Sequence, residues 1–271
     1  MKRSTDALLA LAVALAFLAG CHLKREPVSS VPHLAYPDCG HGPLDRSLPG
    51  ETVGEGELYG DGELRSQPIV ERFSLVRHDC LVIGTARIER PYQLIDLEIV
   101  WDAHQKPLRV WRRITVPGSR NRDGDPDITL YELRTADVTI THRASDGTLD
   151  YARVRGRPPG AVITESRGLL STWFQHANIL PGESSHARTL DTSLPTVVEH
   201  SALLARSPDL DRPAVGRRVR VYKVYGRDAV FTDDHDVVVG DLAGLVPASQ
   251  GGRRPFPPMP LYGGADPVGT P

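Results

Sequence analysis

Four long segments of the chain alternate regularly between apolar and polar side chains. They span residues 69–78, 80–90, 92–102 and 106–117. In YQLIDLEIVWD, for example, one face carries Ile95, Leu97, Ile99 and Trp101, and the other carries Asp96, Glu98 and Asp102. Successive side chains of a β-strand point to opposite faces, so this alternation predicts strands. Strands with one apolar and one polar face are typical of an antiparallel sheet whose polar face lies in water.

The rest of the central region continues this pattern. Further strands are expected at residues 128–134, 137–143, 149–155, 161–165, 194–204, 218–225, 229–232 and 237–239. One helix is expected in SRGLLSTWFQHANILPGE, where an apolar stripe is formed by Leu169, Leu170, Trp173, Phe174 and Ala177. The Pro181-Gly182 pair should end it. The expected fold is mainly β: a large curved antiparallel sheet or half-barrel with one packing helix.

Both flanks of this region are rich in proline and glycine. Residues 21–66 are expected to form a tether with one short strand near GEGELYG. Residues 250–271 are expected to form a disordered or polyproline-like tail. The antiparallel β domain is therefore placed at residues 67–249.

The first residues, MKRSTDALLALAVALAFLAGC, place two basic residues before an apolar run that leads to small residues and Cys21. The run is too short to span a bilayer, and its flanks are typical of a cleaved secretory signal. The ending Leu18-Ala19-Gly20-Cys21 resembles the lipobox of bacterial lipoproteins. That resemblance implies removal of residues 1–20, a diacylglyceryl group on the Cys21 thiol and an acyl chain such as palmitate on the new amino terminus. The alternative is an ordinary signal peptide with a cysteine nearby by chance.

The residue after Cys21 is His22. Lipoproteins retained in the inner membrane of enterobacteria carry an aspartate at this position. The resemblance therefore implies an outer-membrane lipoprotein, on the periplasmic side or at the cell surface, whose membrane partner is reached through the N-terminal lipid.

The chain has three cysteines. If Cys21 carries lipid, Cys39 and Cys80 remain, and an oxidising compartment favours a disulfide between them. The same regions, PDCGHG and VRHDC, also offer a set of zinc-type ligands that adds His41 and His78. A disulfide, a zinc site and unpaired thiols are the three alternatives.

The sequence gives no sign of catalysis or nucleic-acid binding. A net charge of −2 lacks the basic excess of a nucleic-acid-binding protein. There is no Gly-x-Ser-x-Gly elbow, phosphate loop or His-Glu-x-x-His motif. The run Ser184-Ser185-His186 has no visible third member of a triad, and Asp233-Asp234-His235-Asp236 reads better as a hairpin tip than as a metal site. We therefore expect a protein that is not an enzyme and has no cofactor.

One acidic loop is an exception to this expectation, because its residues also fit a calcium site. In NRDGDPDITLYE the alternate positions hold Asn121, Asp123, Asp125 and Asp127, and the twelfth position holds Glu132. Such a row can supply the oxygen ligands that calcium prefers. However, Pro126 replaces the glycine of an EF-hand loop and strands flank the stretch, so it is not an EF-hand. A polar turn between two strands would need the same residue types without an ion.

The order of the elements resembles the periplasmic lipoprotein-localisation proteins and related secreted β-meander proteins. The stretches that carry the resemblance are RGLLSTWFQHANILPGE and VYKVYGRDAVFTDD, and it extends over residues 68–245. It implies a curved sheet capped by a helix, with a concave apolar face that binds a lipid or other apolar ligand. The candidates for lining such a cavity are Trp101, Trp111, Trp173 and Phe174.

An alternating strand and an amphipathic helix need large apolar residues in any case, so the same four residues also fit an ordinary core. The chain has only five Phe and two Met, whereas lipid carriers usually spend more of these on a cavity. The alternative function is a structural or interaction lipoprotein that docks a protein partner through a sheet edge or its proline-rich tail.

Overall fold

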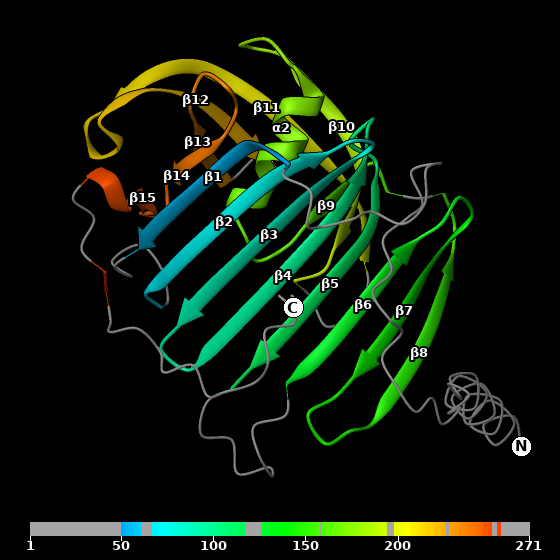
Figure 1. Cartoon of the computed structure of the whole chain (residues 1–271). Helices are drawn as coiled ribbons and strands as arrows, with labels where there is room; N and C mark the ends of the chain where they lie inside the picture. The colour runs from blue at the N-terminus through cyan, green and yellow to red at the C-terminus, as the bar shows by residue number, and fades with distance from the viewer. Residues whose placement is uncertain are drawn as a thin grey trace, which may run out of the picture.

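The computed structural model describes residues 50–60, 67–116, 126–157, 159–193, 198–225, 228–250 and 254–255. These residues form two β-sheets and one short α-helix (Figure 1). The predicted mainly β fold, with a large curved antiparallel sheet and one packing helix, is confirmed. Within the described residues, no helix is long and apolar enough to cross a membrane.

The larger sheet, sheet A, has nine strands in the order β15-β1-β2-β3-β4-β5-β6-β7-β8, and all neighbours are antiparallel. From β1 to β8 the order in space is the order in sequence, because each strand turns back beside the previous one. Its strands are β1 Glu51–Gly60, β2 Ile69–His78, β3 Leu81–Arg90, β4 Gln93–Asp102, β5 Pro107–Thr115, β6 Asp127–Leu133, β7 Asp137–Arg143, β8 Leu149–Arg155 and β15 Val246–Pro247.

The smaller sheet, sheet B, has the order β14-β13-β12-β11-β10-β9. Its strands are β9 Ala161–Ile163, β10 Ser184–Asp191, β11 Val198–Arg212, β12 Arg217–Val224, β13 Asp228–Thr232 and β14 Val238–Asp241. The helical elements are the 3₁₀ turns η2 Gly168–Leu170, η3 Pro213–Val215 and η4 Ala248–Gln250, and the α-helix α2 Ser171–Ala177.

The helix belongs to the connection between two parallel strands, which are the one parallel pair among the described strands. β9 and β10 run parallel, and parallel neighbours need a crossover connection, which is commonly a helix. The crossover runs through η2 and α2, where Leu169, Leu170, Trp173 and Phe174 are buried, as the apolar stripe predicts. The helix ends before the Pro-Gly pair, because Asn178 takes a left-handed conformation with φ of 42° and its N–H bonds to the Phe174 carbonyl.

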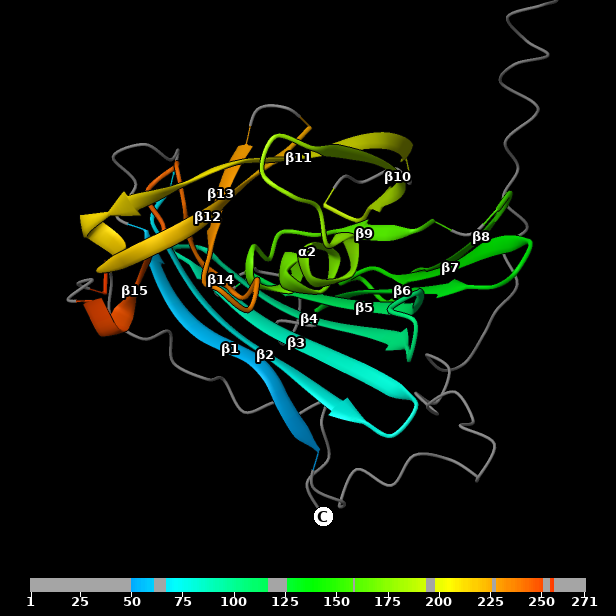
Figure 2. The ribbon, with the colours of Figure 1, turned by 90° about the horizontal axis from the view of Figure 1, so that it is seen from above.

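The core lies between the two sheets. α2 and sheet B both lie on the concave side of sheet A (Figure 2). The largest cluster of buried apolar side chains joins the inward side chains of sheet A to those of the helix and of sheet B. We call this concave side the inner face of sheet A and the opposite side its outer face.

The structure differs from the expected organisation in two places. β1 is a ten-residue strand inside the segment expected to be mainly a tether. β10 was not expected, and it contains the Ser184-Ser185-His186 run. These differences make sheet A wider than predicted and add a strand to sheet B.

The expectation that the polar face lies in water is wrong for the middle of sheet A. On the outer face, Asp96 and Glu98 are each only 7% exposed, and Arg109 is 6% exposed. The alternation therefore predicts correctly which side chains share a face, but not whether that face is exposed.

Candidate functional site

The start of the helical segment is held by a buried carboxylate. Glu71 on β2 points to the inner face and is 0% exposed. Its Oε1 accepts hydrogen bonds from Ser166 Oγ at 2.6 Å and from the Gly168 N–H at 2.7 Å, and its Oε2 accepts one from the Arg167 N–H at 3.1 Å. Negative charge next to the free N–H groups at the start of a helical turn is stabilising. Glu71 thus fixes the crossover to sheet A.

Burial raises the pKa of Glu71 above its ordinary value, and the three hydrogen bonds oppose this rise. Glu71 was not among the predicted site residues, although the sequence carries a signal for it. Glu71 has the same parity as Ile69, Phe73 and Leu75, so it is a charged residue on an apolar face. A charge at such a position must be hydrogen-bonded by a partner across the core.

Two glycines allow the helical segment to approach sheet A closely. A Cβ atom at Gly168 would lie 2.1 Å from the ring of Phe73. A Cβ atom at Gly84 on β3 would lie 2.7 Å from Trp101 Cζ3 and 2.9 Å from Leu169 Cδ2. These distances are shorter than van der Waals contact, so the packing of α2 on the inner face depends on both glycines.

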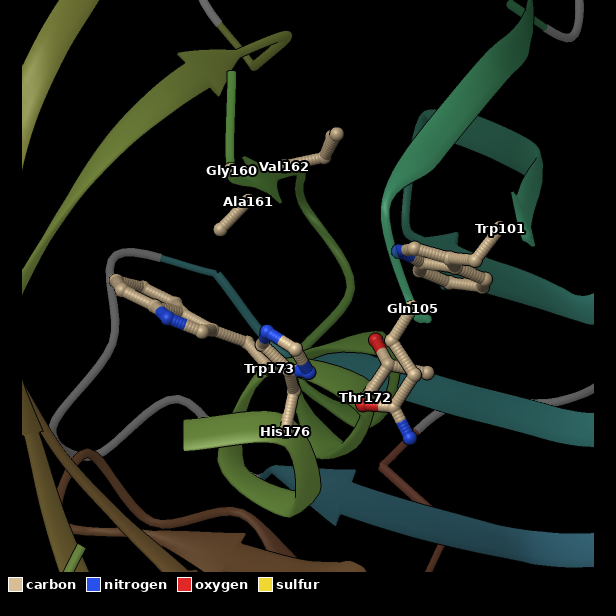
Figure 3. A pocket seen from close by; sticks show the side chains of 8 residues that line it. All are labelled: Trp101, Gln105, Gly160, Ala161, Val162, Thr172, Trp173 and His176. Atoms are coloured by element: carbon tan, nitrogen blue, oxygen red, sulfur yellow. The ribbon is translucent and has the colours of Figure 1, made fainter. Parts of the chain in front are cut away.

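A small pocket opens beside this helix, between the end of β4, the start of β9 and α2 (Figure 3). It is lined by Trp101, Gln105, Gly160, Ala161, Val162, Thr172, Trp173 and His176. The two indoles lie on opposite sides of it. Gly160 and His176 are exposed at its rim, and the apolar lining residues are buried.

The room inside the pocket is about 10 Å³, which is enough for one water molecule. Gln105 lies in the β4–β5 turn with a φ of 58°, and its Oε1 is buried without a hydrogen-bond partner among the described residues. A buried amide oxygen normally has such a partner. The pocket therefore combines apolar walls with one polar group that a water molecule or a ligand could satisfy.

The structure brings together two of the four predicted cavity residues. Trp101 and Trp173 face the pocket. Phe174 lies toward sheet B, where its ring stacks on Tyr222 with centroids 4.4 Å apart. Trp111 pairs with Glu98 across β4 and β5 and lies on the outer face of sheet A, so it cannot line a cavity on the inner face.

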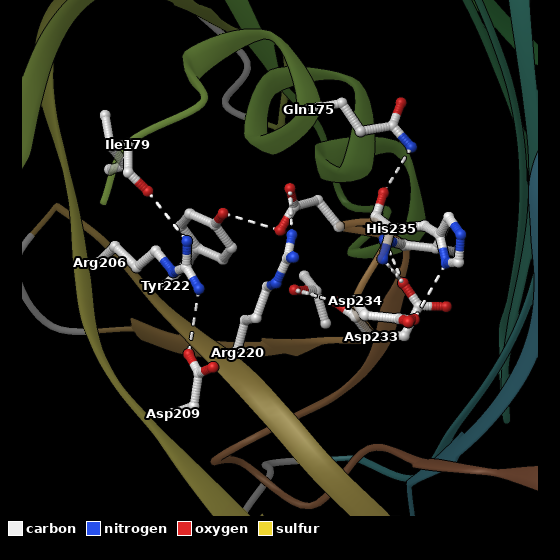
Figure 4. A network of polar contacts seen from close by, with 12 residues as sticks. Gln175, Ile179, Arg206, Asp209, Arg220, Tyr222, Asp233, Asp234 and His235 are labelled. Atoms are coloured by element: carbon white, nitrogen blue, oxygen red, sulfur yellow. Dashed lines mark hydrogen bonds and ion pairs between the residues drawn. The ribbon is translucent and has the colours of Figure 1, made fainter. Parts of the chain in front are cut away.

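On the sheet B side, a polar network supports Tyr222 (Figure 4). The Tyr222 hydroxyl donates to Asp236 Oδ1 at 2.8 Å, and Arg220 forms an ion pair with Asp236 at 2.8 Å. Burial, followed by the bond to Asp236, raises the pKa of Tyr222. The Arg206 guanidinium lies 5.9 Å from the tyrosine ring centroid and donates to the carbonyl of Ile179 just after α2. This network holds the helix against sheet B.

The acidic run at Asp233 lies at the tip of the β13–β14 hairpin, as predicted. Asp233 Oδ1 accepts hydrogen bonds from the N–H groups of His235 and Val237, which is a turn-forming role. Side chains of Asp233, Asp234 and His235 come within 4.8 Å of one another, but Asp234 and His235 are exposed. Gln175 on α2 donates to the His235 carbonyl at 3.1 Å, so the tip also contacts the helix.

Several predicted site residues lie outside the described residues. They are Cys21, Cys39, Asn121, Asp123 and Asp125. Asp127, the fourth residue of the predicted calcium loop, begins β6, and its Oδ1 accepts a hydrogen bond from the Ser145 N–H at 2.6 Å. The calcium site stays a prediction.

Cys80 is disulfide-bonded. This bond leaves no thiolate at Cys80 for the zinc alternative. The other half of the predicted bridge, Cys39, lies outside the described part of the chain, so the pairing itself stays a prediction.

Comparisons with known proteins add little. No family model matches the chain, and no curated protein matches it. A search of solved structures found a crystal structure of a DUF1089 family protein from Pseudomonas aeruginosa, with 13% sequence identity and a TM-score of 0.39. The match covers 62% of this chain and 87% of that chain.

Proposed function

We propose that this protein is a membrane-anchored, non-enzymatic lipoprotein of the cell envelope that binds a lipid or other apolar ligand between its two sheets. The anchor is the lipid on Cys21. The observation that carries the ligand site is the pocket beside α2, where Trp101 and Trp173 line opposite sides and the apolar lining is buried. A mostly apolar pocket with a few polar groups at its rim is the usual form of a small-ligand site.

Binding requires this pocket to enlarge, because about 10 Å³ cannot hold an acyl chain. In this proposal the element that moves is α2, against the contacts that hold it to both sheets. It has seven residues, and short helices gain most of their stability from packing rather than from their own hydrogen bonds. Outward movement of Trp173 would open the inner face, and each buried methylene of the ligand would then contribute about 0.8 kcal/mol.

Quenching of tryptophan fluorescence by dibrominated stearic acid tests this proposal, because the chain has three tryptophans and bromine quenches an indole only at close range. The Trp111→Phe variant keeps only the two pocket tryptophans and should show saturable quenching. The double variant Trp101→Phe/Trp173→Phe keeps only Trp111 and should show none. Equal quenching in both variants, or none in the first, would contradict a ligand site at the pocket.

A second candidate function is the docking of a protein partner at the β8 edge of sheet A. The nearly filled pocket favours it, since a carrier needs room that this conformation lacks. Among the described strands, β8 pairs only with β7, and Tyr151 on β8 is 50% exposed. An unpaired strand edge can accept a further strand from a partner. A photo-crosslinking residue at Tyr151 should then capture a protein in the envelope, whereas one at Tyr92, which is 77% exposed elsewhere, should not.

A further inference from the structure

The outer face of sheet A carries a continuous buried patch. The strand register places Ile83, Val100 and Arg109 in one row across β3, β4 and β5. The next row continues through Glu98, Trp111 and Leu130 on β4, β5 and β6. Exposed fractions in these two rows are 6% for Ile83, 1% for Val100, 6% for Arg109, 7% for Glu98, 7% for Trp111 and 3% for Leu130. We call these six residues the outer patch.

The described elements do not account for this burial. α2 and sheet B both lie on the opposite side of sheet A (Figure 2). The main apolar cluster contains the inward neighbours Val82, Ile99 and Val110, but none of the outer patch. An apolar side chain on an uncovered sheet face keeps part of its surface in water. A further segment must therefore cover the outer patch.

The chain itself reaches this face near its C-terminal end. Arg254 forms an ion pair with Glu89, which lies on the outer face at the far end of β3. Glu89 is also 3.3 Å from Arg72 on β2, and Arg254 is near enough to Tyr59 on β1 to lower the pKa of its hydroxyl against the larger effect of burial. The polypeptide is thus already on the outer face at residue 254.

We propose that the following segment, residues 256–262, crosses the outer face and covers the outer patch. Its sequence is FPPMPLY, which combines four large apolar side chains with prolines that favour an extended polyproline conformation. Strand spacing and rise place Trp111 roughly 16 Å from Glu89 along the sheet surface. At about 3.1 Å per residue, an extended segment covers that distance in roughly five residues. Phe256, Met259 and Leu261 are therefore within reach of the outer patch.

The proline-rich segment would then be an intramolecular cover rather than an idle tail. This assignment does not depend on the ligand site at the pocket, because the two sites lie on opposite faces of sheet A.

Fluorine NMR of the full chain labelled with 5-fluorotryptophan tests the assignment. Three signals are expected, and Trp111→Phe identifies one of them. In the full chain the Trp111 signal should be protected from a soluble gadolinium relaxation agent. Replacing Phe256, Met259 and Leu261 together by serine should increase its relaxation severalfold and leave the Trp101 and Trp173 signals unchanged. The control Val268→Ser should change none of the three.

An unchanged Trp111 signal in the triple-serine variant would overturn the proposal. The main competing occupant is a segment before residue 50, which a Cys39–Cys80 disulfide would hold near β3. In that case Cys80→Ser would expose Trp111 and the triple-serine variant would not. A chain that ends at Pro255 gives an independent result, since it should expose Trp111 as strongly as the triple-serine variant does.

Discussion

The inner face of sheet A buries hydrocarbon against α2 and sheet B, whereas the outer face of the same strands is held by ion pairs between neighbouring strands. These outer pairs are Arg72–Glu89, Arg87–Asp96, Arg109–Glu98 and Arg153–Asp137. On the inner face, Glu71 is 0% exposed, and the side chains of the Arg112–Glu165 pair are 16% and 6% exposed. Both inner positions fasten the crossover between β9 and β10. Charges therefore fix the helix on the inner face and align the strands on the outer face.

The largest loss of stability is expected from removing the Glu71 carboxylate on the inner face. Glu71→Ala should lower the free energy of unfolding by about 4 kcal/mol, because it leaves the buried Ser166 hydroxyl, the buried Gly168 N–H and the part-buried Arg167 N–H without this acceptor. Urea denaturation would measure this loss. The matched control is Glu55→Ala on exposed β1, which should change stability by less than about 0.5 kcal/mol. A loss no larger than that of the control would show that Glu71 does not anchor the crossover.

The next largest loss of stability is expected from breaking the Arg109–Glu98 ion pair on the outer face. Both side chains are only 8% exposed, so Glu98→Ala should cost about 3 kcal/mol by leaving the guanidinium charge without this partner. The double variant Glu98→Leu/Arg109→Met should recover most of that loss, since it removes both charges. If the double variant is less stable than Glu98→Ala, the ion pair stabilises the fold by more than aligning the two strands.

A smaller loss is expected from filling the close contact at the helix. Gly168→Ala should cost about 2 kcal/mol, because the added methyl group overlaps the ring of Phe73. Gly160→Ala is the matched control, since a Cβ atom there meets only the Arg188 carbonyl oxygen, at 3.8 Å. Equal melting temperatures for the two variants would mean that the helical segment can shift away from β2 without loss.

The smallest expected effect is a change of folding stability with pH. The folded-state pKa of Glu71 is raised above its ordinary value of 4.5, so the folded state binds this proton more tightly than the unfolded state does. The contribution of Glu71 to stability is fully present below the unfolded pKa and is lost as the pH rises through the folded pKa. Relative to Glu71→Gln, which cannot titrate, the wild type should therefore gain stability as the pH falls toward 4.5. If the wild type instead loses stability as the pH falls, the hydrogen bonds lower the pKa of Glu71 by more than burial raises it.

The alternation in the sequence predicted β2 to β8 within one or two residues, because most of these strands have a largely apolar face. β10 could not be predicted in this way. Its sequence SSHARTLD has polar residues on both faces, and its place is set by pairing with β11 and β9 rather than by its own pattern.

The sequence predicted part of the site. Side chains alternate along the strand, so Trp111 lies on the face opposite to Val110 and Ile114. It could therefore have been assigned to the outer face before the structure was known. The meeting of Trp101 with Trp173 depends on the crossover, which joins residues far apart in the chain and leaves no local signal. Burial of the outer face could not be predicted, because it depends on what covers the sheet.

Native mass spectrometry of the purified chain tests the ligand proposal most directly. Replacing Cys21 by serine removes the proposed site of lipid attachment, so any remaining lipid mass is a bound ligand. We expect a noncovalent apolar ligand on this protein and its loss in Gly160→Met, which covers the rim of the pocket. The control Tyr92→Met should retain it. A ligand-free mass for Cys21→Ser, in detergents that preserve other lipid complexes, would contradict a binding site between the sheets.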